Sequence, residues 1–219
     1  MNSQEAVPLT ATPADLAVPP SLSSTPGPAE FFLSFLMTPA EIGAVVPSST
    51  RLAHCMTEWL RLDDASVVAE FGPGTGAFTS VILEKLPSGC NFFALEINSD
   101  FAGILRRRFS GVRIIEGDVS EVATICDSLG VEKVDCIVSG LPWASFSPAK
   151  QEDLLAATLS VLRPGGQFVT FSYLQGLLMP GGQRFRRLLN RSFAGVSQSR
   201  IVWGNLPPAF VYRCHSREA

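Results

Sequence analysis

The sequence predicts an α/β protein: a parallel sheet with helices on both faces. The first observation is a β-branched apolar run at residues 67–71, followed at once by three glycines at alternate positions and then by a helical pattern over residues 77–86. The second is that three further apolar runs, at residues 92–95, 112–116 and 134–138, also stop abruptly in polar or glycine-containing loops. The third is the separation of these runs by helical segments, which is typical of βαβ units.

Length and composition fit one domain preceded by a tail. The chain has 219 residues, 46% of them hydrophobic and 17% charged, which is enough for one core of ordinary size. Residues 1–28 are rich in Pro, Ser, Thr and Ala, and such a composition buries too little apolar surface to offset the entropy of ordering. They also lack the basic start and apolar core of a signal peptide. We therefore predict a disordered tail at 1–28, a helical segment at 29–62 and the main domain at 63–219.

The helical segment opens with an apolar stretch. Phe31, Phe32 and Phe35 belong to a run that ends at Met37, far short of the roughly 20 residues needed to cross a bilayer. Two interpretations remain open: a helix packed over the binding site, or a helix lying in a membrane interface. A second helix is expected over residues 52–62, where apolar side chains recur at helical spacing.

Charge and cysteine content narrow the function classes. The net charge is −3, so no overall field attracts nucleic acid or an anionic membrane. From Arg163 to Arg217, however, the chain has eight arginines and no acidic residue, and these are either solvated helix charges or a surface for an anionic partner. Five cysteines and two histidines show neither a Cys-x-x-Cys pair nor zinc-like spacing, so we predict no metal site and a reducing compartment.

The glycine loop is the centre of the predicted site. Gly72, Gly74 and Gly76 lie between strand and helix, where glycine lets the backbone approach a ligand and free N–H groups at the helix start face the crevice. Their spacing is not the Gly-x-Gly-x-x-Gly that accommodates a pyrophosphate. Glu96 ends the second strand twenty residues after Gly76, and a carboxylate placed there accepts hydrogen bonds from a ribose diol. The sequence therefore predicts a nucleoside-type pocket.

These motifs carry a family resemblance. Residues 70–76, Glu96 and residues 117–119 resemble the motifs of class I S-adenosylmethionine-dependent methyltransferases, and the resemblance extends over about residues 31–214. It implies a Rossmann-like sheet of seven strands in the order 3-2-1-4-5-7-6, with the amino-terminal helices over the cofactor site. It also implies S-adenosylmethionine as cofactor and S-adenosylhomocysteine as product.

The same resemblance assigns roles within the pocket. It implies that the glycine loop passes the methionine part of the cofactor, that Glu96 holds the ribose hydroxyls, and that Asp118 meets the adenine amino group. The cofactor-binding residues expected from it are Glu70, Gly72, Gly74, Gly76, Glu96, Ile97, Asp118, Val119, Ser139, Gly140 and Leu141.

The remaining chain supplies the rest of the predicted sheet. A helix is expected to begin at Pro148, with Ser147 as its cap. The elements expected after it are a turn at 162–166, a strand at 167–173, a helix at 183–193, and a closing antiparallel hairpin of residues 200–203 and 209–213.

The loop after the fourth strand bears on the methyl acceptor. Ribosomal-RNA adenine dimethyltransferases carry Asn or Asp, Leu, Pro and an aromatic residue there, whereas this chain has Gly140 in place of the amide or acid. That departure, together with the acidic chain, disfavours a nucleic-acid substrate. We expect Trp143 and Tyr173 to be the catalytic-site aromatics that hold a methylated ammonium by cation–π contact.

A closer resemblance is to the bacterial phospholipid N-methyltransferases. It is carried by residues 31–32, 44–49, 70–76, 139–142 and 205–209. The resemblance implies stepwise N-methylation of phosphatidylethanolamine towards phosphatidylcholine by a cytoplasmic enzyme associated peripherally with the inner leaflet, and it favours the membrane-interface interpretation of the Phe-rich helix. It implies an anionic membrane and a lipid substrate as partners, with no nucleic acid and no obligate protein partner.

Within this reading, Arg184 and Arg187 are expected to meet anionic lipid or the substrate phosphate, together with Phe31, Phe32 and Phe35 at the membrane. Alternatives remain open: N-methylation of ornithine lipid, a ribosomal-RNA-type or small-molecule methyltransferase, and a cofactor-binding module without catalysis.

Overall fold

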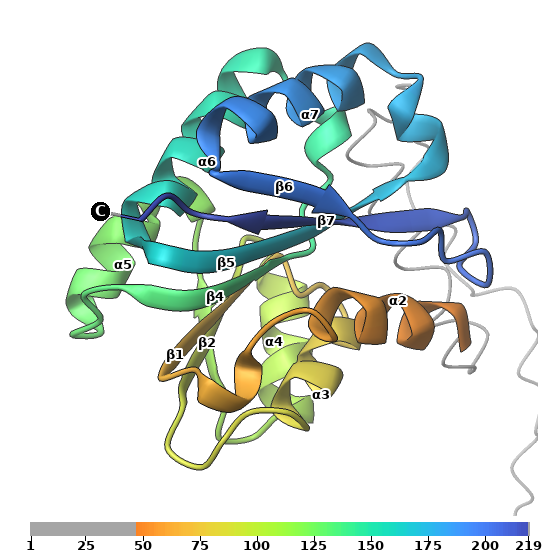
Figure 1. Ribbon diagram of the computed structural model, residues 1–219. Coiled ribbons are helices and arrows are strands. Elements are labelled where there is room, and N and C mark those ends of the chain that lie inside the picture. The colour runs from red at the N-terminus through yellow and green to blue at the C-terminus, as the bar shows by residue number, and fades with distance from the viewer. Residues whose placement is uncertain (1–46, 219) are drawn as a thin grey trace, which may run out of the picture.

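The computed structural model describes residues 47–218 and contains a seven-stranded sheet in the order β3-β2-β1-β4-β5-β7-β6 (Figure 1). This order confirms the predicted one. The predictions for residues 1–46, including the tail at 1–28 and the interfacial residues Phe31, Phe32 and Phe35, lie outside the described residues. The strands are β1 (Val67–Phe71), β2 (Asn91–Glu96), β3 (Arg113–Glu116), β4 (Val134–Ser139), β5 (Leu162–Tyr173), β6 (Gly195–Gln198) and β7 (Ala209–His215).

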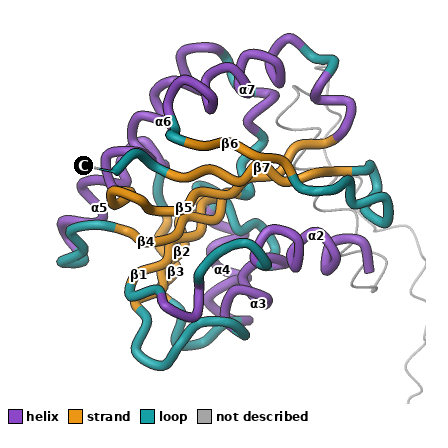
Figure 2. The backbone as a smooth tube through the Cα atoms, in the orientation of Figure 1, coloured by secondary structure: helices purple, strands orange, loops and turns teal. Residues whose placement is uncertain are grey.

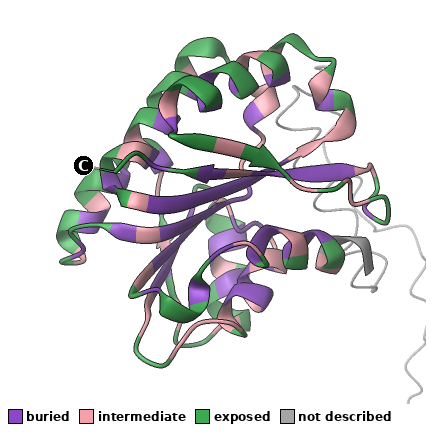
Figure 3. Cartoon of the chain, viewed as in Figure 1, coloured by how far each residue is buried: buried purple, intermediate pink, exposed green. Residues whose placement is uncertain are grey.

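Helices cover both faces of the sheet (Figure 1). One face packs against α2 (Pro47–Thr57), α3 (Ala77–Leu83) and α4 (Ser99–Arg108), and the other against α5 (Val122–Ser128), α6 (Pro148–Val161) and α7 (Pro180–Ser192). A short 3₁₀ helix, η1 (Leu62–Asp64), precedes β1, and three others follow strands: η2 (Val119–Glu121), η3 (Trp143–Ser145) and η4 (Leu174–Leu177). Because both faces are covered, the central strands are buried almost throughout (Figure 3).

The boundaries of several elements differ from the predicted ones. Helix α3 ends at Leu83, three residues before the predicted end. The expected turn at 162–166 lies inside β5: Leu162 pairs with Val134 and Gln167 with Cys136, so the residues between form an irregular excursion within the strand. Helix α6 begins as predicted, with the Ser147 hydroxyl accepting the Lys150 N–H at 3.3 Å.

The predicted first strand of the closing hairpin was wrong. Residues 200–203 contribute only an isolated bridge from Val202 to Ala209, and the true partner of β7 is β6, which directly follows α7. The side chains of β6 are mostly exposed because it is the edge strand, so it carries no apolar run that a sequence pattern could detect. Residues 199–208 instead form a long connection, seen at the right of Figure 2.

The topology brings the functional segments to one edge of the sheet. Strands β1 to β5 are parallel in register, so their carboxyl ends meet at the same edge. Strand β7 runs antiparallel to β5, with Ala209 paired to Tyr173, so the β6–β7 connection reaches this edge as well. We call it the carboxyl edge.

Among the described residues, the cysteines and helices fit an ordinary α/β core. All five cysteines are free thiols, and Cys136 is buried as its apolar strand predicts. Within residues 47–218 there is no group of His, Cys, Asp and Glu suited to hold a metal ion. No helix in the same range is both long and apolar enough to cross a membrane.

Candidate active site

The glycine loop begins where β1 ends at the carboxyl edge. Gly72, Gly74 and Gly76 all adopt positive φ, a conformation that side chains strongly disfavour. At Gly76 a side chain would also collide with the ring of Phe109. The Arg108 guanidinium donates to the carbonyl oxygen of Thr75 at 2.8 Å, which ties the loop to the end of α4. The loop is therefore a fixed backbone cradle.

Gly140 is held against this cradle. Its N–H donates to the Phe71 carbonyl oxygen at 2.7 Å, and a Cβ atom added to it would lie 2.5 Å from the carbonyl oxygen of Gly72. That neighbour is backbone and cannot move aside as a side chain would. In the sequence pattern Gly140 marks the loss of an acceptor side chain, whereas in the structure the close approach of the β4 and β1 ends requires glycine.

Glu96 links the first two strand ends. It is buried, and its carboxylate accepts the Gly74 N–H at 2.9 Å and the Asn98 N–H at 3.0 Å. Each carboxylate oxygen keeps a second lone pair, so the group can still accept hydroxyl hydrogens. The next residue, Ile97, leaves 68% of its surface exposed at the same edge. An apolar surface thus lies beside a carboxylate.

Asp118 follows β3 and is already paired. Its carboxylate accepts the Ser120 N–H at 2.8 Å and forms an ion pair with Lys150 at 2.8 Å. Partial burial opposes ionisation, but hydrogen bonds from Lys150 and Ser120 outweigh it and lower the pKa of Asp118. Val119, the next residue, is buried in the core. Lys150 lies in the first turn of α6, and no motif in the sequence connected it with Asp118.

Glu70 is a buried acid directly before the glycine loop. The Thr79 hydroxyl donates to one carboxyl oxygen of Glu70 at 2.7 Å, and the other oxygen, Oε1, has no hydrogen-bond partner among the described residues. Burial, opposed by the Thr79 hydrogen bond and reinforced by the charge of Glu96, raises the pKa of Glu70 to about 8. Glu70 is therefore protonated at neutral pH, with one oxygen available to a ligand.

Tyr173 stands where β5 ends. It is half-buried, its ring lies 5.4 Å edge-on from Phe171, and Phe171 lies 5.7 Å edge-on from Phe78. Phe78 belongs to the first turn of α3, so these rings connect the end of β5 with the glycine loop. Burial raises the pKa of Tyr173 to about 12, and its hydroxyl is neutral at physiological pH. Sequence reasoning missed Phe78, although its position two residues after Gly76 marks it as a neighbour of the loop.

The structure contradicts the prediction for Trp143. Its side chain is only 2% exposed, the ring stacks on Phe185 at 4.6 Å, and the indole N–H donates to the Ser139 hydroxyl at 3.0 Å. Trp143 is therefore a core residue beneath α7 and offers no face to an ammonium. Ser139 is likewise buried, and its hydroxyl accepts the hydrogen bond from Trp143. Leu141, half-buried, packs beside Gly72.

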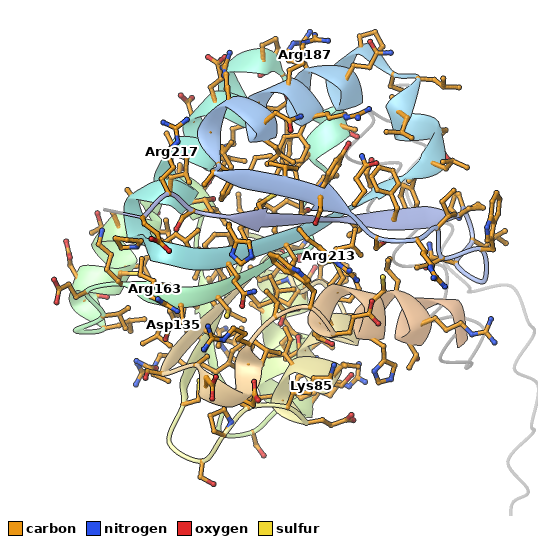
Figure 4. All side chains as sticks on the ribbon, viewed as in Figure 1. Lys85, Asp135, Arg163, Arg187, Arg213 and Arg217 are labelled. Carbon is orange, nitrogen blue, oxygen red and sulfur yellow. The ribbon has the colours of Figure 1, made fainter. Side chains whose placement is uncertain are left out.

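The arginines between Arg163 and Arg217 differ in their partners and positions. Arg163, Arg191 and Arg213 pair with Asp135, Glu152 and Glu58 respectively, which are structural ion pairs. Figure 4 places Arg163 and Arg217 at the edge opposite the glycine loop, and Arg187 on the outer surface of α7. Arg184 is half-buried and Arg187 exposed. Neither makes a hydrogen bond or ion pair with the cradle among the described residues, so the structure does not gather them with Glu96 and Asp118.

Comparison with known proteins identifies the family. Residues 68–166 match the family model described as a methyltransferase domain. An ornithine lipid N-methyltransferase of Singulisphaera acidiphila is 35% identical over 191 residues, which make up 84% of this chain and 95% of that protein. The chain belongs to the class I S-adenosylmethionine-dependent methyltransferases.

Two further matches place this methyltransferase among its relatives. A ribosomal RNA small subunit methyltransferase A of Prosthecochloris aestuarii is 36% identical over 81 residues, 37% of this chain and 29% of that protein. The crystal structure of an O-methyltransferase from Bacillus cereus in complex with SAH has a TM-score of 0.62 at 18% identity, covering 86% of this chain and 92% of that one, and it shares the fold. The predicted fold, cofactor and enzyme class, an S-adenosylmethionine-dependent N-methyltransferase, are confirmed.

The residues of the carboxyl edge fit the cofactor of this methyltransferase. Its positively charged amino group matches the unpartnered oxygen of buried Glu70, since a nearby cation favours the ionised carboxylate. Glu96 would accept its ribose hydroxyls through its spare lone pairs, and the exposed Ile97 and the Asp118 carboxylate would meet its adenine. The individual contacts remain predictions. The cradle that would hold them is present in the protein alone.

Proposed function

We propose that this methyltransferase N-methylates the primary amine of a zwitterionic membrane lipid, with ornithine lipid as the leading acceptor. The observation that carries the proposal is the whole-length relationship to an ornithine lipid N-methyltransferase, at 35% identity over 95% of that protein. The sequence resemblance favoured phosphatidylethanolamine, which we retain as the second acceptor. Both headgroups combine a primary ammonium with an anionic group, a carboxylate in one lipid and a phosphate in the other.

Methyl transfer to an amine requires the protein mainly to bind and orient the two reactants. When bound, S-adenosylmethionine supplies a methyl group whose bond to sulfur breaks as the bond to the amine nitrogen forms, while the proton of the amine leaves to water. The task of the side chains is to align a neutral amine and to exclude water. A lipid ammonium must first lose a proton to become a nucleophile. Burial of the amine beside the positive charge of the cofactor favours its neutral form. This account requires no dedicated base.

Tyr173 and Phe78 are the proposed headgroup aromatics. Tyr173 presents a neutral hydroxyl where β5 ends, and Phe78 replaces buried Trp143 as the second ring beside the glycine loop. Aromatic faces attract a cationic, partly methylated headgroup by about 0.5–2 kcal/mol each.

An acceptor panel tests the proposal. Purified protein is incubated with labelled S-adenosylmethionine and, separately, with vesicles containing ornithine lipid, vesicles containing phosphatidylethanolamine, ribosomal RNA and small soluble amines. We expect label on lipid amines, and we expect Tyr173→Leu and Phe78→Leu, which each remove an aromatic face, to lower kcat/KM for lipid about tenfold while cofactor affinity is unchanged. Label on RNA or soluble amines, with none on lipid, would refute the lipid assignment.

A further inference from the structure

Exposed apolar side chains gather beside the proposed headgroup site. Among the described residues six large apolar side chains are exposed, and five of them lie at the carboxyl edge. Ile97 belongs to the cofactor cradle, and the sixth, Ile104, lies in the middle of α4. The other four are Leu178, Met179, Trp203 and Leu206, which we call the apolar rim. Isolated exposed apolar residues are ordinary, but a group on one edge marks an interaction surface.

The four rim residues come from two neighbouring loops. Tyr173 and Ala209 are paired across β5 and β7, and the Leu174 N–H donates to the Pro208 carbonyl oxygen at 2.8 Å. The segment after β5 and the segment before β7 therefore leave the sheet side by side. The first carries Leu178, 83% exposed, and the second carries Trp203, 68% exposed. The β6–β7 connection is the loop at the far right of Figure 1.

The second loop holds its apolar side chains outward by its own hydrogen bonds. The Asn205 N–H donates to the Val202 carbonyl oxygen at 3.1 Å, and the buried Asn205 amide donates to the Pro207 carbonyl oxygen at 2.7 Å. Asn205 is thus turned inward, while its neighbours Trp203 and Leu206, 75% exposed, are turned out. Exposure of apolar side chains to water is unfavourable, and their transfer to an apolar phase would remove that free-energy penalty.

Arginines lie close to the rim residues. Arg184 and Arg200 are near them in the chain, and Arg51 lies directly against Gly204 of the second loop. Within residues 47–218 none of these three arginines takes part in an ion pair. The whole segment from Arg163 to Arg217 contains no acidic residue. Exposed apolar side chains beside arginines that form no ion pair within residues 47–218 match the interface of an anionic bilayer, where rings and aliphatic chains enter the acyl boundary and arginines meet phosphates.

We propose that the apolar rim docks this methyltransferase on an anionic bilayer. The inference deepens the proposed function, because docking through these loops places the end of β5, with Tyr173, at the membrane interface. A headgroup amine then reaches the site while its acyl chains stay in the bilayer. The docking surface is identified by the exposure of its side chains and the charge of the nearby arginines, and it does not depend on which lipid is methylated.

Vesicle binding by the full chain tests the docking. Flotation is measured with phosphatidylcholine vesicles with and without phosphatidylglycerol, comparing Trp203→Ser/Leu206→Ser with Ile104→Ser, an exposed apolar control away from the edge. We expect at least a tenfold weaker partition for the rim variant and no change for the control. Arg184→Gln and Arg200→Gln should each weaken binding to anionic vesicles roughly fivefold, and high salt should remove that difference.

Depth-dependent quenching identifies the contact directly. The chain has three tryptophans, of which Trp143 is buried, Trp59 is half-buried and Trp203 is exposed. Lipids brominated in their acyl chains should quench the wild-type emission, and Trp203→Phe should abolish that quenching. The proposal is overturned if the rim variant floats like wild type, or if vesicles fail to quench Trp203. It is also overturned if Trp203 is already shielded without lipid, by residues 1–46 or by a second copy detected in ultracentrifugation.

A water-soluble substrate separates this proposal from the proposed function. With short-chain amine lipids below their micelle concentration, the rim variant should methylate at the wild-type rate, since no docking is needed, and lose activity only on vesicles. If wild type docks through Trp203 but methylates no lipid amine, the docking stands and the proposed function fails. If lipid is methylated equally by the rim variant on vesicles, the docking fails and the proposed function stands.

Discussion

Glu70→Gln should change how stability depends on pH. The pKa of Glu70 is about 8 in the folded protein against 4.5 for an ordinary glutamate, because burial penalises its ionised form. Between these values the folded state keeps a proton that the unfolded state has lost. The free energy of unfolding therefore decreases as pH rises, by about 1.4 kcal/mol per pH unit. The Glu70 contribution is complete below pH 4.5 and lost once pH passes about 8.

The glutamine variant removes this dependence with little change in shape. Its amide oxygen can accept the Thr79 hydroxyl as the carboxyl does, but it binds no proton in this range. Over two pH units within the window, the variant should gain about 3 kcal/mol relative to wild type, which is twice the slope given above. Urea denaturation at about pH 5.5, 6.5 and 7.5, under reducing conditions, measures this difference directly. Titrating groups that do not interact with Glu70 cancel in the comparison.

The same carboxyl should report cofactor binding. If the amino group of the cofactor meets Glu70, binding near pH 7 should release about one proton from wild type and none from the variant. Isothermal titration in buffers of different ionisation enthalpy measures that proton. Parallel stability profiles for wild type and Glu70→Gln would refute the buried, protonated state of Glu70. Equal proton release would refute its contact with the cofactor.

Three other substitutions test the geometry of the site. Gly140→Ala should cost about 1–3 kcal/mol of stability and weaken cofactor binding at least tenfold, because its Cβ meets backbone, whereas Gly195→Ala, with open space around its Cβ, should behave as wild type in denaturation and cofactor titration. Trp143→Phe should lower the free energy of unfolding by about 1–3 kcal/mol through the lost bond to a buried hydroxyl, with kcat/KM for lipid unchanged. Lys150→Met should raise the pKa of Asp118, so that the acid limb of the cofactor-binding pH profile moves to higher pH.

Each of these has a clear contrary outcome. Normal cofactor affinity in Gly140→Ala would show that the ends of β4 and β1 can separate, and so that the cradle is not fixed. A tenfold loss of turnover in folded Trp143→Phe would return that ring to the headgroup site. An unmoved acid limb in Lys150→Met would mean that cofactor binding does not depend on ionised Asp118.

The sequence predicted what depends on local chain order. Gly72, Glu96 and Asp118 are each attached to the end of a strand, and parallel strands bring such ends to one edge whatever the rest of the chain does. What the sequence could not predict depends on contacts between distant segments. The pairing of Lys150 with Asp118 joins residues 32 positions apart, and the requirement for Gly140 arises from the backbone of another strand.

The prediction for Trp143 failed for a related reason. A tryptophan after a strand end has the same local pattern whether it lines a site or packs below a helix, and only the position of α7 decides between them. Edge strand β6 escaped prediction because exposure removes the apolar signal. Conversely, Trp203 was assigned to a strand because it is apolar, although the structure leaves it exposed in a loop.

The most direct test of lipid N-methylation is headgroup-resolved mass spectrometry of vesicles that contain equal amounts of ornithine lipid and phosphatidylethanolamine. The purified protein is incubated with them and with S-adenosylmethionine carrying a deuterated methyl group. We predict that deuterated methyl groups appear on the amine of ornithine lipid first, with phosphatidylethanolamine labelled more slowly or not at all. Labelled phosphatidylethanolamine alone would keep the membrane chemistry and reverse the preferred headgroup. Unlabelled lipids from a protein that still binds its cofactor would contradict the proposed function.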